Sequence, residues 1–285
     1  MARSAETGVS EGGTSVFKEV LKRDRLIGLA ALVLFAALAW WYLLSGAAMD
    51  MPALSDMNMD MPGMSGMAES MARPTPWTAQ YAWIVFIMWW VMMIAMMLPS
   101  AAPMILLYGL INDRQAQRGG TFVPNGIFAL GYITIWGVFS VIATLLQWQL
   151  DRVALMSPMM QTTSAILGGG ILIAAGVYQL TPLKYACLKH CRGPIEFLTR
   201  HWRPGYSGAW RMGIDHGLYC LGCCWVLMAL LFYGGVMNLY WIIGLTLFVL
   251  LEKIAPAGQL VSRLSGVVLI AWGGVVLAAA TGLVS

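Results

Sequence analysis

The chain has 285 residues, of which 59% are hydrophobic and 11% are charged, and its mean hydropathy is +0.73. These values lie outside the range of soluble globular domains, so the sequence predicts an all-α, polytopic transmembrane helix bundle in contact with membrane lipid. The formal net charge of +4 is interpreted through membrane topology, and nucleic acid is not expected as a partner.

Seven apolar segments, each near the roughly 20 residues that cross a hydrocarbon core, are expected as transmembrane helices. The sixth is short, and a tight turn is expected between the fifth and the sixth. The segments cover residues 26–48, 77–111, 122–146, 163–185, 209–233, 236–251 and 264–284. The expected organisation is a cytoplasmic tail (1–25), a first helix (26–48), an outward loop (49–76) and a six-helix membrane core (77–285) that carries the metal motifs.

Basic residues gather in alternate loops. Fourteen Lys and Arg residues lie shortly before the first segment, from position 18 on, or around the connections that follow the second, fourth and sixth segments, whereas the alternate loops hold only Arg73 and Arg152. The positive-inside rule then predicts a multi-pass protein of the cytoplasmic (inner) membrane, with its N-terminus inside and its C-terminus outside. If the first segment is instead a signal peptide cleaved near residues 46–48, six spans remain.

The first outward loop is rich in methionine, with eight Met residues between positions 49 and 71. Pro, Gly, Ser and Asp are spread through it, so it is not expected to cross the membrane or to form a core. Thioether sulfur is a polarisable ligand that prefers Cu(I) to hard ions. We therefore interpret the loop as a segment that captures soft metal ions. The alternative is a low-complexity linker. The candidate ligands are Met57, Met59, Met61, Met64 and Met67.

The second segment carries six more methionines between positions 88 and 104. At about 100° per residue they cover two neighbouring faces of one helix. Pro99 and Pro103 are expected to open the helix backbone beside them. Methionine is also a good apolar filler, so packing is an equal alternative. The candidate metal ligands here are Met92, Met93, Met96 and Met97.

The fifth segment combines histidine, cysteine and methionine at helical spacing. Met212, His216, Cys220 and Cys223 fall within about 80° of one face, with Cys224 at its edge. Ionisable groups inside a membrane span are costly and indicate function. Imidazole and thiolates bind Zn(II) or Cu(I), and the methionine favours Cu(I), with zinc and silver as alternatives.

A third cluster, formed by Cys187, His190 and Cys191, follows the fourth segment. It lacks the paired CxxC motifs of a zinc ribbon, so we expect a relay site that another helix or a partner completes. The alternative is a set of scattered thiols in a reducing compartment. All five cysteines fall in the membrane or on its cytoplasmic side, which favours reduced thiols over disulfides.

Charged residues also end two of the segments. Lys184 closes the fourth, and Glu252 and Lys253 close the sixth. Such residues are most often interfacial anchors or a stabilising ion pair. We hypothesise that Glu252 pairs with Lys184.

Over residues 77–256 the chain resembles a bacterial family labelled predicted metal-binding integral membrane proteins, a domain of unknown function. The resemblance rests on the segments MMIAMMLPSAAPMILLY, YQLTPLKYACLKHCRGP, HGLYCLGCCWVLMALLFYGGVMNLYW and LLEK. It implies metal binding by the motif residues Met92, Met93, Met96, Met97, Cys187, His190, Cys191, His216, Cys220, Cys223 and Cys224.

These clusters form a series from thioethers outside to thiols on the cytoplasmic side. The series predicts a Cu(I) importer or transfer conduit, between a periplasmic copper donor and a cytoplasmic or membrane acceptor. No nucleotide-binding motif is apparent, so the chain is not a pump by itself, and an enzyme is not expected. A second hypothesis is a copper chaperone or assembly subunit for a membrane metalloenzyme. A third, less favoured, is a membrane thiol oxidoreductase, and the remaining alternative is methionine packing in a purely structural protein.

Overall fold

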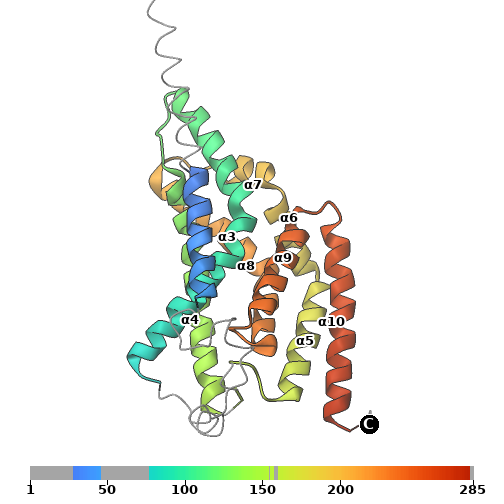
Figure 1. Cartoon of the computed structure of the whole chain (residues 1–285). Helices are drawn as coiled ribbons and strands as arrows, with labels where there is room; N and C mark the ends of the chain where they lie inside the picture. Colours follow the sequence, from blue (N-terminus) through green and yellow to red (C-terminus); the bar gives the residue numbers. More distant parts are fainter. Residues whose placement is uncertain (1–27, 46–76, 154, 157–159, 283–285) are drawn as a thin grey trace, which may run out of the picture.

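The computed structural model describes residues 28–45, 77–153, 155–156 and 160–282. Within these ranges every regular element is a helix, with one isolated bridge between Met156 and Thr162, so the predicted all-α class is confirmed. An N-terminal helix covers Gly28–Leu44 (blue in Figure 1). The helices that follow are α3 (Ala79–Gln117), α4 (Asn125–Arg152), α5 (Ala165–Gln179), α6 (Pro182–Arg192), α7 (Pro194–His201), α8 (Gly205–Gly234), α9 (Leu239–Ile254) and α10 (Gly258–Ala280).

Four of these helices, α3, α4, α8 and α10, are long and apolar enough to cross a membrane. A fifth span results if α5 and α6 together count as one broken helix. The helix Gly28–Leu44 is apolar but shorter. These lengths are consistent with a membrane protein, while the total of seven spans and the inside–outside orientation stay predictions.

The predicted fourth span, 163–185, is not one straight helix. The chain bends by 64° between α5 and α6. Thr181 caps the start of α6 by accepting a hydrogen bond from the backbone N–H of Lys184, and Pro182 follows at the first helical position. Proline has no N–H to continue the preceding helix and is well suited to begin a new one. The break therefore has a local cause in the sequence.

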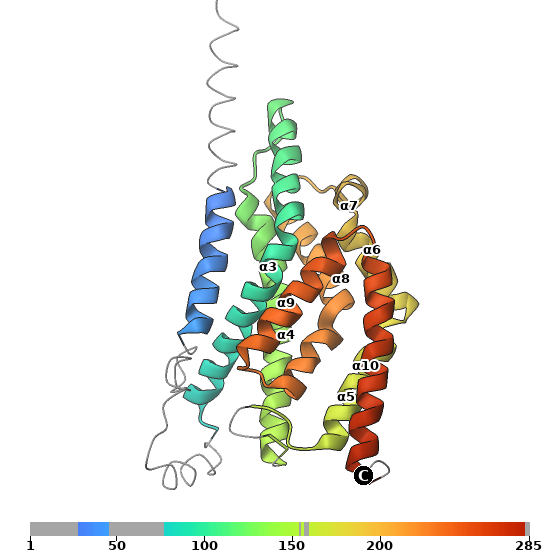
Figure 2. The same ribbon diagram turned by 45° about the vertical axis from the view of Figure 1, so that its right-hand side comes forward.

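Helix α8 lies at the centre of the bundle. It contacts α4, α5, α6 and α9, while α5 packs along α10 and α3 packs on α4 and α9. Figures 1 and 2 show the long helices running side by side, with α6 and α7 at the same end as the loop between α9 and α10. This arrangement brings residues of α3, α4, α6 and α9 around one stretch of α8.

Glycines allow α4 and α8 to cross in close contact. A Cβ atom on Gly213 would lie 2.1 Å from the carbonyl oxygen of Phe128, and one on Gly131 would lie 2.2 Å from that of Trp210. Small residues permit this kind of backbone approach between apolar helices. The contact places the α4 side chains that follow Gly131 directly against α8.

Helix α3 continues through both of its prolines, and Figure 2 shows it bending along its length. Proline removes a backbone hydrogen bond and bends a helix. Near this point the carbonyl oxygen of Met97 accepts hydrogen bonds from the Tyr132 hydroxyl at 3.1 Å and from Ser100 Oγ at 2.8 Å. The backbone beside the α3 methionines is thus tied to α4.

A buried ion pair joins α6 to α9. Lys184 Nζ lies 2.6 Å from a carboxylate oxygen of Glu252, and both side chains are 1% exposed. Lys184 also donates to the side-chain oxygen of Gln179, which accepts a second bond from Ser262 Oγ of α10 at 3.1 Å. The predicted pairing of Glu252 with Lys184 is confirmed, although it lies in the interior and not at an exposed interface.

Candidate metal site

The predicted metal-binding face of α8 is turned into the protein interior. Met212, His216, Cys220, Cys223 and Cys224 are all buried. Their spacing of four, four, three and one residues keeps them on one side of the helix. Side chains of α3, α4 and α6 meet this side. The placement of these residues agrees with the helical periodicity of the sequence.

Four cysteines, Cys191, Cys220, Cys223 and Cys224, come together at this face, and we refer to them as the thiol cluster. Cys191 Sγ, from the end of α6, lies 4.0 Å from Cys223 Sγ. The Cys223 and Cys224 thiols each donate to the carbonyl oxygen of Cys220, at 3.0 and 2.9 Å. All four are free thiols.

A methionine of α3 extends the thiol cluster with a thioether. Met97 Sδ lies 3.9 Å from Cys224 Sγ. The other α3 candidates, Met92, Met93 and Met96, are also buried, each at most 1% exposed. Thioether and thiol sulfur atoms from two helices that are far apart in sequence therefore share one apolar interior.

Two residues at the thiol cluster were not among the sequence candidates. Lys253 Nζ of α9 donates to Cys220 Sγ at 3.0 Å and to Ser100 Oγ at 2.9 Å. The Tyr132 hydroxyl of α4 lies 3.1 Å from the same sulfur atom. Lys253 was expected as an interfacial anchor or as part of an ion pair. It lies in the segment LLEK, which the family resemblance includes, and this was the signal that could have assigned it to the site. Tyr132 had no such signal.

His216 sits one turn before Cys220 in an aromatic enclosure. Its ring centroid lies 5.6 Å from that of Tyr132, 6.1 Å from Phe128 and 5.6 Å from Phe197. Within the described residues its buried Nδ1 atom has no hydrogen-bond partner. A buried polar atom without a partner costs free energy, so this nitrogen is suited to a ligand that enters the site.

The remaining candidates lie around the thiol cluster and not in it. Met212 Sδ accepts a hydrogen bond from the backbone N–H of Arg203 at 3.2 Å, near the start of α8. Cys187 Sγ packs on Gly222, where an added Cβ would lie only 2.8 Å away. His190 turns from the thiols and stacks on Tyr219, with ring centroids 4.2 Å apart.

The methionine loop, with Met57, Met59, Met61, Met64 and Met67, lies outside the described residues. Across the ranges that the structure does describe, no group of three or more His, Cys, Asp and Glu side chains has an arrangement ready to hold a metal ion. The donor set at α8 consists of close pairs, Cys191 with Cys223 and Cys224 with Met97.

A family model described as PpoB2, copper chaperone, matches residues 86–276. The matched range includes α4 to α9 and the whole thiol cluster. No curated protein and no solved structure matches the chain.

Proposed function

The chain belongs to the PpoB2 copper chaperone family, and from this premise we propose that it holds Cu(I) within its helix bundle and delivers it to a copper-dependent partner. The observation that carries the proposal is the thiol cluster in contact with Met97. Thiolates and thioethers are soft ligands that favour Cu(I) over hard ions, although thiolates also bind zinc.

The distances within the cluster suit one small soft ion held by two or three sulfur atoms. Cys191 Sγ and Cys223 Sγ are 4.0 Å apart, and a metal–thiolate bond is about 2.3 Å long, as for zinc. An ion between these two atoms therefore reaches both after little movement. Cys220 stands beside this pair, and Met97 stands beside Cys224, so neighbouring sulfur atoms are present for exchange of ligands.

The other side chains at the cluster stabilise the bound form. Thiols bind metal as thiolates, and a thiolate in an apolar interior needs a counter-charge or hydrogen-bond donors. Lys253 supplies the charge to Cys220. The Tyr132 hydroxyl lies 3.1 Å from the same sulfur, and its single proton, which bonds the Met97 carbonyl oxygen in this structure, would turn to Cys220 once that sulfur is a thiolate. His216, with its unpaired Nδ1 atom, is a further ligand within one helical turn.

Passage of Cu(I) across the cytoplasmic membrane is the second candidate function. It is favoured by the six buried or largely buried methionines of α3, which follow one another along a long apolar helix. In this version a periplasmic donor loads the thioethers, and a cytoplasmic or membrane acceptor takes copper from the thiols. The methionine loop would serve the loading step.

The test is Cu(I) affinity, measured by competition with a colorimetric chelator on the purified full chain in detergent. We expect tight binding that is lost when Cys220, Cys223 and Cys224 are all replaced by serine. Met228→Leu is the matched control, because Met228 is buried in α8 and is not part of the thiol cluster. Absence of Cu(I) binding in the unaltered protein would refute the proposal.

A second measurement separates the two candidate functions. The copper-loaded protein in detergent is mixed with a Cu(I)-accepting protein, and the same protein in sealed liposomes is supplied with external Cu(I). A chaperone transfers copper in the first experiment without uptake in the second. Uptake that depends on Cys220 supports transport. Thiol–disulfide cycling without any metal would instead favour the oxidoreductase hypothesis.

A further inference from the structure

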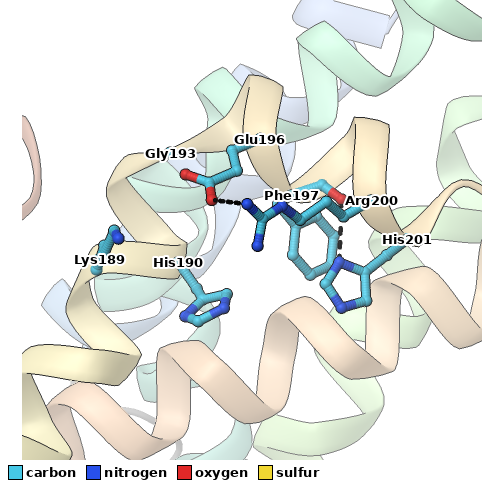
Figure 3. Close-up of a pocket in the computed structure, with 7 residues that line it drawn as sticks. All are labelled: Lys189, His190, Gly193, Glu196, Phe197, Arg200 and His201. Carbon is cyan, nitrogen blue, oxygen red and sulfur yellow. Dashed lines mark hydrogen bonds and ion pairs between the residues drawn. The ribbon is translucent and has the colours of Figure 1, made fainter.

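A small pocket opens between α6 and α7, at the end of the bundle where the loop between α9 and α10 lies. Its volume is about 90 Å³, and its lining includes His190, His201, Glu196 and Arg200. Figure 3 shows one imidazole projecting from α6 and the other from the end of α7, on the same rim of the pocket. His201 was not a candidate from the sequence.

Both imidazoles are held in the form that binds metal through Nε2. Nδ1 of His190 lies 2.8 Å from the carbonyl oxygen of Ala186, and Nδ1 of His201 lies 3.1 Å from that of Phe197. A carbonyl oxygen only accepts, so each Nδ1 must carry the proton and donate it. In the neutral form of such a ring the lone pair resides on Nε2, as in histidines whose backbone bond orients them for metal.

Aromatic rings fix both imidazoles in place. His190 stacks on Tyr219 with an interplanar angle of 2° and a centroid separation of 4.2 Å. His201 stacks on Phe197 at 4.8 Å and meets the edge of Tyr219 at 6.5 Å. Tyr219 thus contacts both imidazoles, and little rotamer freedom remains to be lost on binding.

The charges around the pocket favour a monovalent cation over a divalent one. Glu196 forms an ion pair with Arg200 at 3.1 Å, so this arginine is neutralised locally. Lys189 also lines the pocket and carries an unneutralised positive charge. Repulsion from that charge doubles for a divalent ion, whereas neutral imidazole donors bind Cu(I) without needing to lose a proton.

The pocket adjoins the thiol cluster. His190 is followed directly by Cys191, whose sulfur lies 4.0 Å from Cys223 Sγ. Phe197, which stacks on His201, also meets the ring of buried His216 at 5.6 Å. The half-buried His190 is therefore adjacent in sequence to Cys191, and the half-buried His201 is separated from His216 by the ring of Phe197.

We propose that this pocket is a second, exposed Cu(I) site, with His190 and His201 as its ligands, through which copper enters or leaves the thiol cluster. This inference rests on the proposed copper-holding function and adds the place where the thiol cluster exchanges copper with other molecules. Imidazole binds Cu(I) less firmly than a set of thiolates, so an ion at this pocket is retained weakly and is passed on readily.

Chemical protection in the unaltered full chain tests the site directly. The protein in detergent is treated with diethyl pyrocarbonate, which modifies accessible imidazole, in the presence and absence of Ag(I) as a soft monovalent probe. Mass spectrometry then identifies each modified residue. We expect Ag(I) to protect both His190 and His201. Modification of both residues at unchanged rates would overturn the proposal, because it would show that no soft ion occupies the pocket.

Variants separate this inference from the proposed function. In the variant with Cys220, Cys223 and Cys224 replaced by serine, protection at the pocket should persist while tight Cu(I) binding is lost. In His190→Phe with His201→Phe, which retains the ring stacking, the thiol cluster should still fill at equilibrium. Its copper should pass more slowly to a soluble chelator. An unchanged rate of copper release overturns the exchange role even if the thiol cluster binds copper.

The basic residues provide the control. Lys189→Ala removes a positive charge from the pocket without removing an imidazole, so protection by Ag(I) should be retained or increase. If inorganic phosphate protects the histidines, and Lys189→Ala abolishes that effect while Ag(I) has none, the pocket is an anion site and the metal assignment is wrong.

Discussion

Lys253 Nζ lies 3.0 Å from Cys220 Sγ and so links α9 to the thiol-bearing face of α8. A second bond, to Ser100 Oγ at 2.9 Å, holds the same ammonium group from α3. The lysine brings a positive charge to thiols that otherwise lie among apolar and aromatic side chains. This contact makes Lys253 a part of the proposed copper site.

Replacing Lys253 by leucine should weaken Cu(I) binding. The apolar side chain adds no sulfur ligand, but Cys220 loses the counter-charge of its thiolate. Second-layer residues of metal sites typically change affinity by about 10- to 100-fold, and we expect a loss of that size in a competition titration. Arg263→Leu, at an exposed basic residue of α10 outside both the thiol cluster and the pocket between α6 and α7, is the control. Equal affinities for the two variants would show that the ammonium has no part in binding.

Met97→Leu tests whether the thioether contributes as a ligand. Leucine has a similar volume, and such exchanges usually cost less than about 1.5 kcal/mol of stability. Cu(I) affinity should nevertheless fall, because the sulfur atom beside Cys224 is lost. Met104→Leu, in the same buried helix, serves as the comparison and should leave affinity unchanged. The prediction fails if the two substitutions behave alike in the same chelator competition.

The Lys184–Glu252 pair should dominate the stability of the contact between α6 and α9. Lys184→Met leaves a buried carboxylate without its cation, which costs about 3–5 kcal/mol. Replacing both residues by methionine should cost much less, because no unpaired charge remains. Thermal unfolding in detergent measures the difference. Glu196→Gln, which breaks an exposed ion pair worth at most about 1 kcal/mol, is the control.

An exchange of the two charges, Lys184→Glu with Glu252→Lys, sharpens this test. If the pair acts through its mutual attraction, the exchanged protein should recover part of the stability lost by either single variant. Recovery will be incomplete, because Gln179 and Ser262 hydrogen-bond around the lysine in its present position. A double variant no more stable than the worse single one would indicate that packing, and not charge, holds the contact.

Gly213→Ala should disrupt the crossing of α4 and α8. The added methyl group would lie 2.1 Å from the carbonyl oxygen of Phe128, which is backbone and cannot move aside alone. We expect a lower unfolding temperature and, since Tyr132 shifts with α4, weaker Cu(I) binding. Gly244→Ala in α9 meets nothing within 4 Å and should be neutral or stabilising, because alanine favours helix by about 1 kcal/mol over glycine.

Features that depend on one helix alone were predictable from the sequence. Apolar length identified the long helices, and the 3.6-residue period showed that Met212, His216, Cys220 and Cys223 share a face. Both are local properties of the chain. The burial of the α3 methionines agrees with the same helical period. The pairing of Glu252 with Lys184 joins two helices, and it was inferred from the cost of placing charge in an apolar setting.

Features that depend on contacts between helices were decided by the tertiary structure. The separation of His190 from Cys187 and Cys191 follows from the packing of α6 on α8, where Tyr219 attracts the imidazole and Gly222 admits the thiol. The contacts of Lys253 and Tyr132 with Cys220 join segments 33 and 88 residues apart. Helical periodicity states which side chains share a face but not which helix that face meets. Which helix lies against that face depends on packing throughout the bundle, including close contacts such as those at Gly131 and Gly213. The residue pattern of a single helix does not determine it.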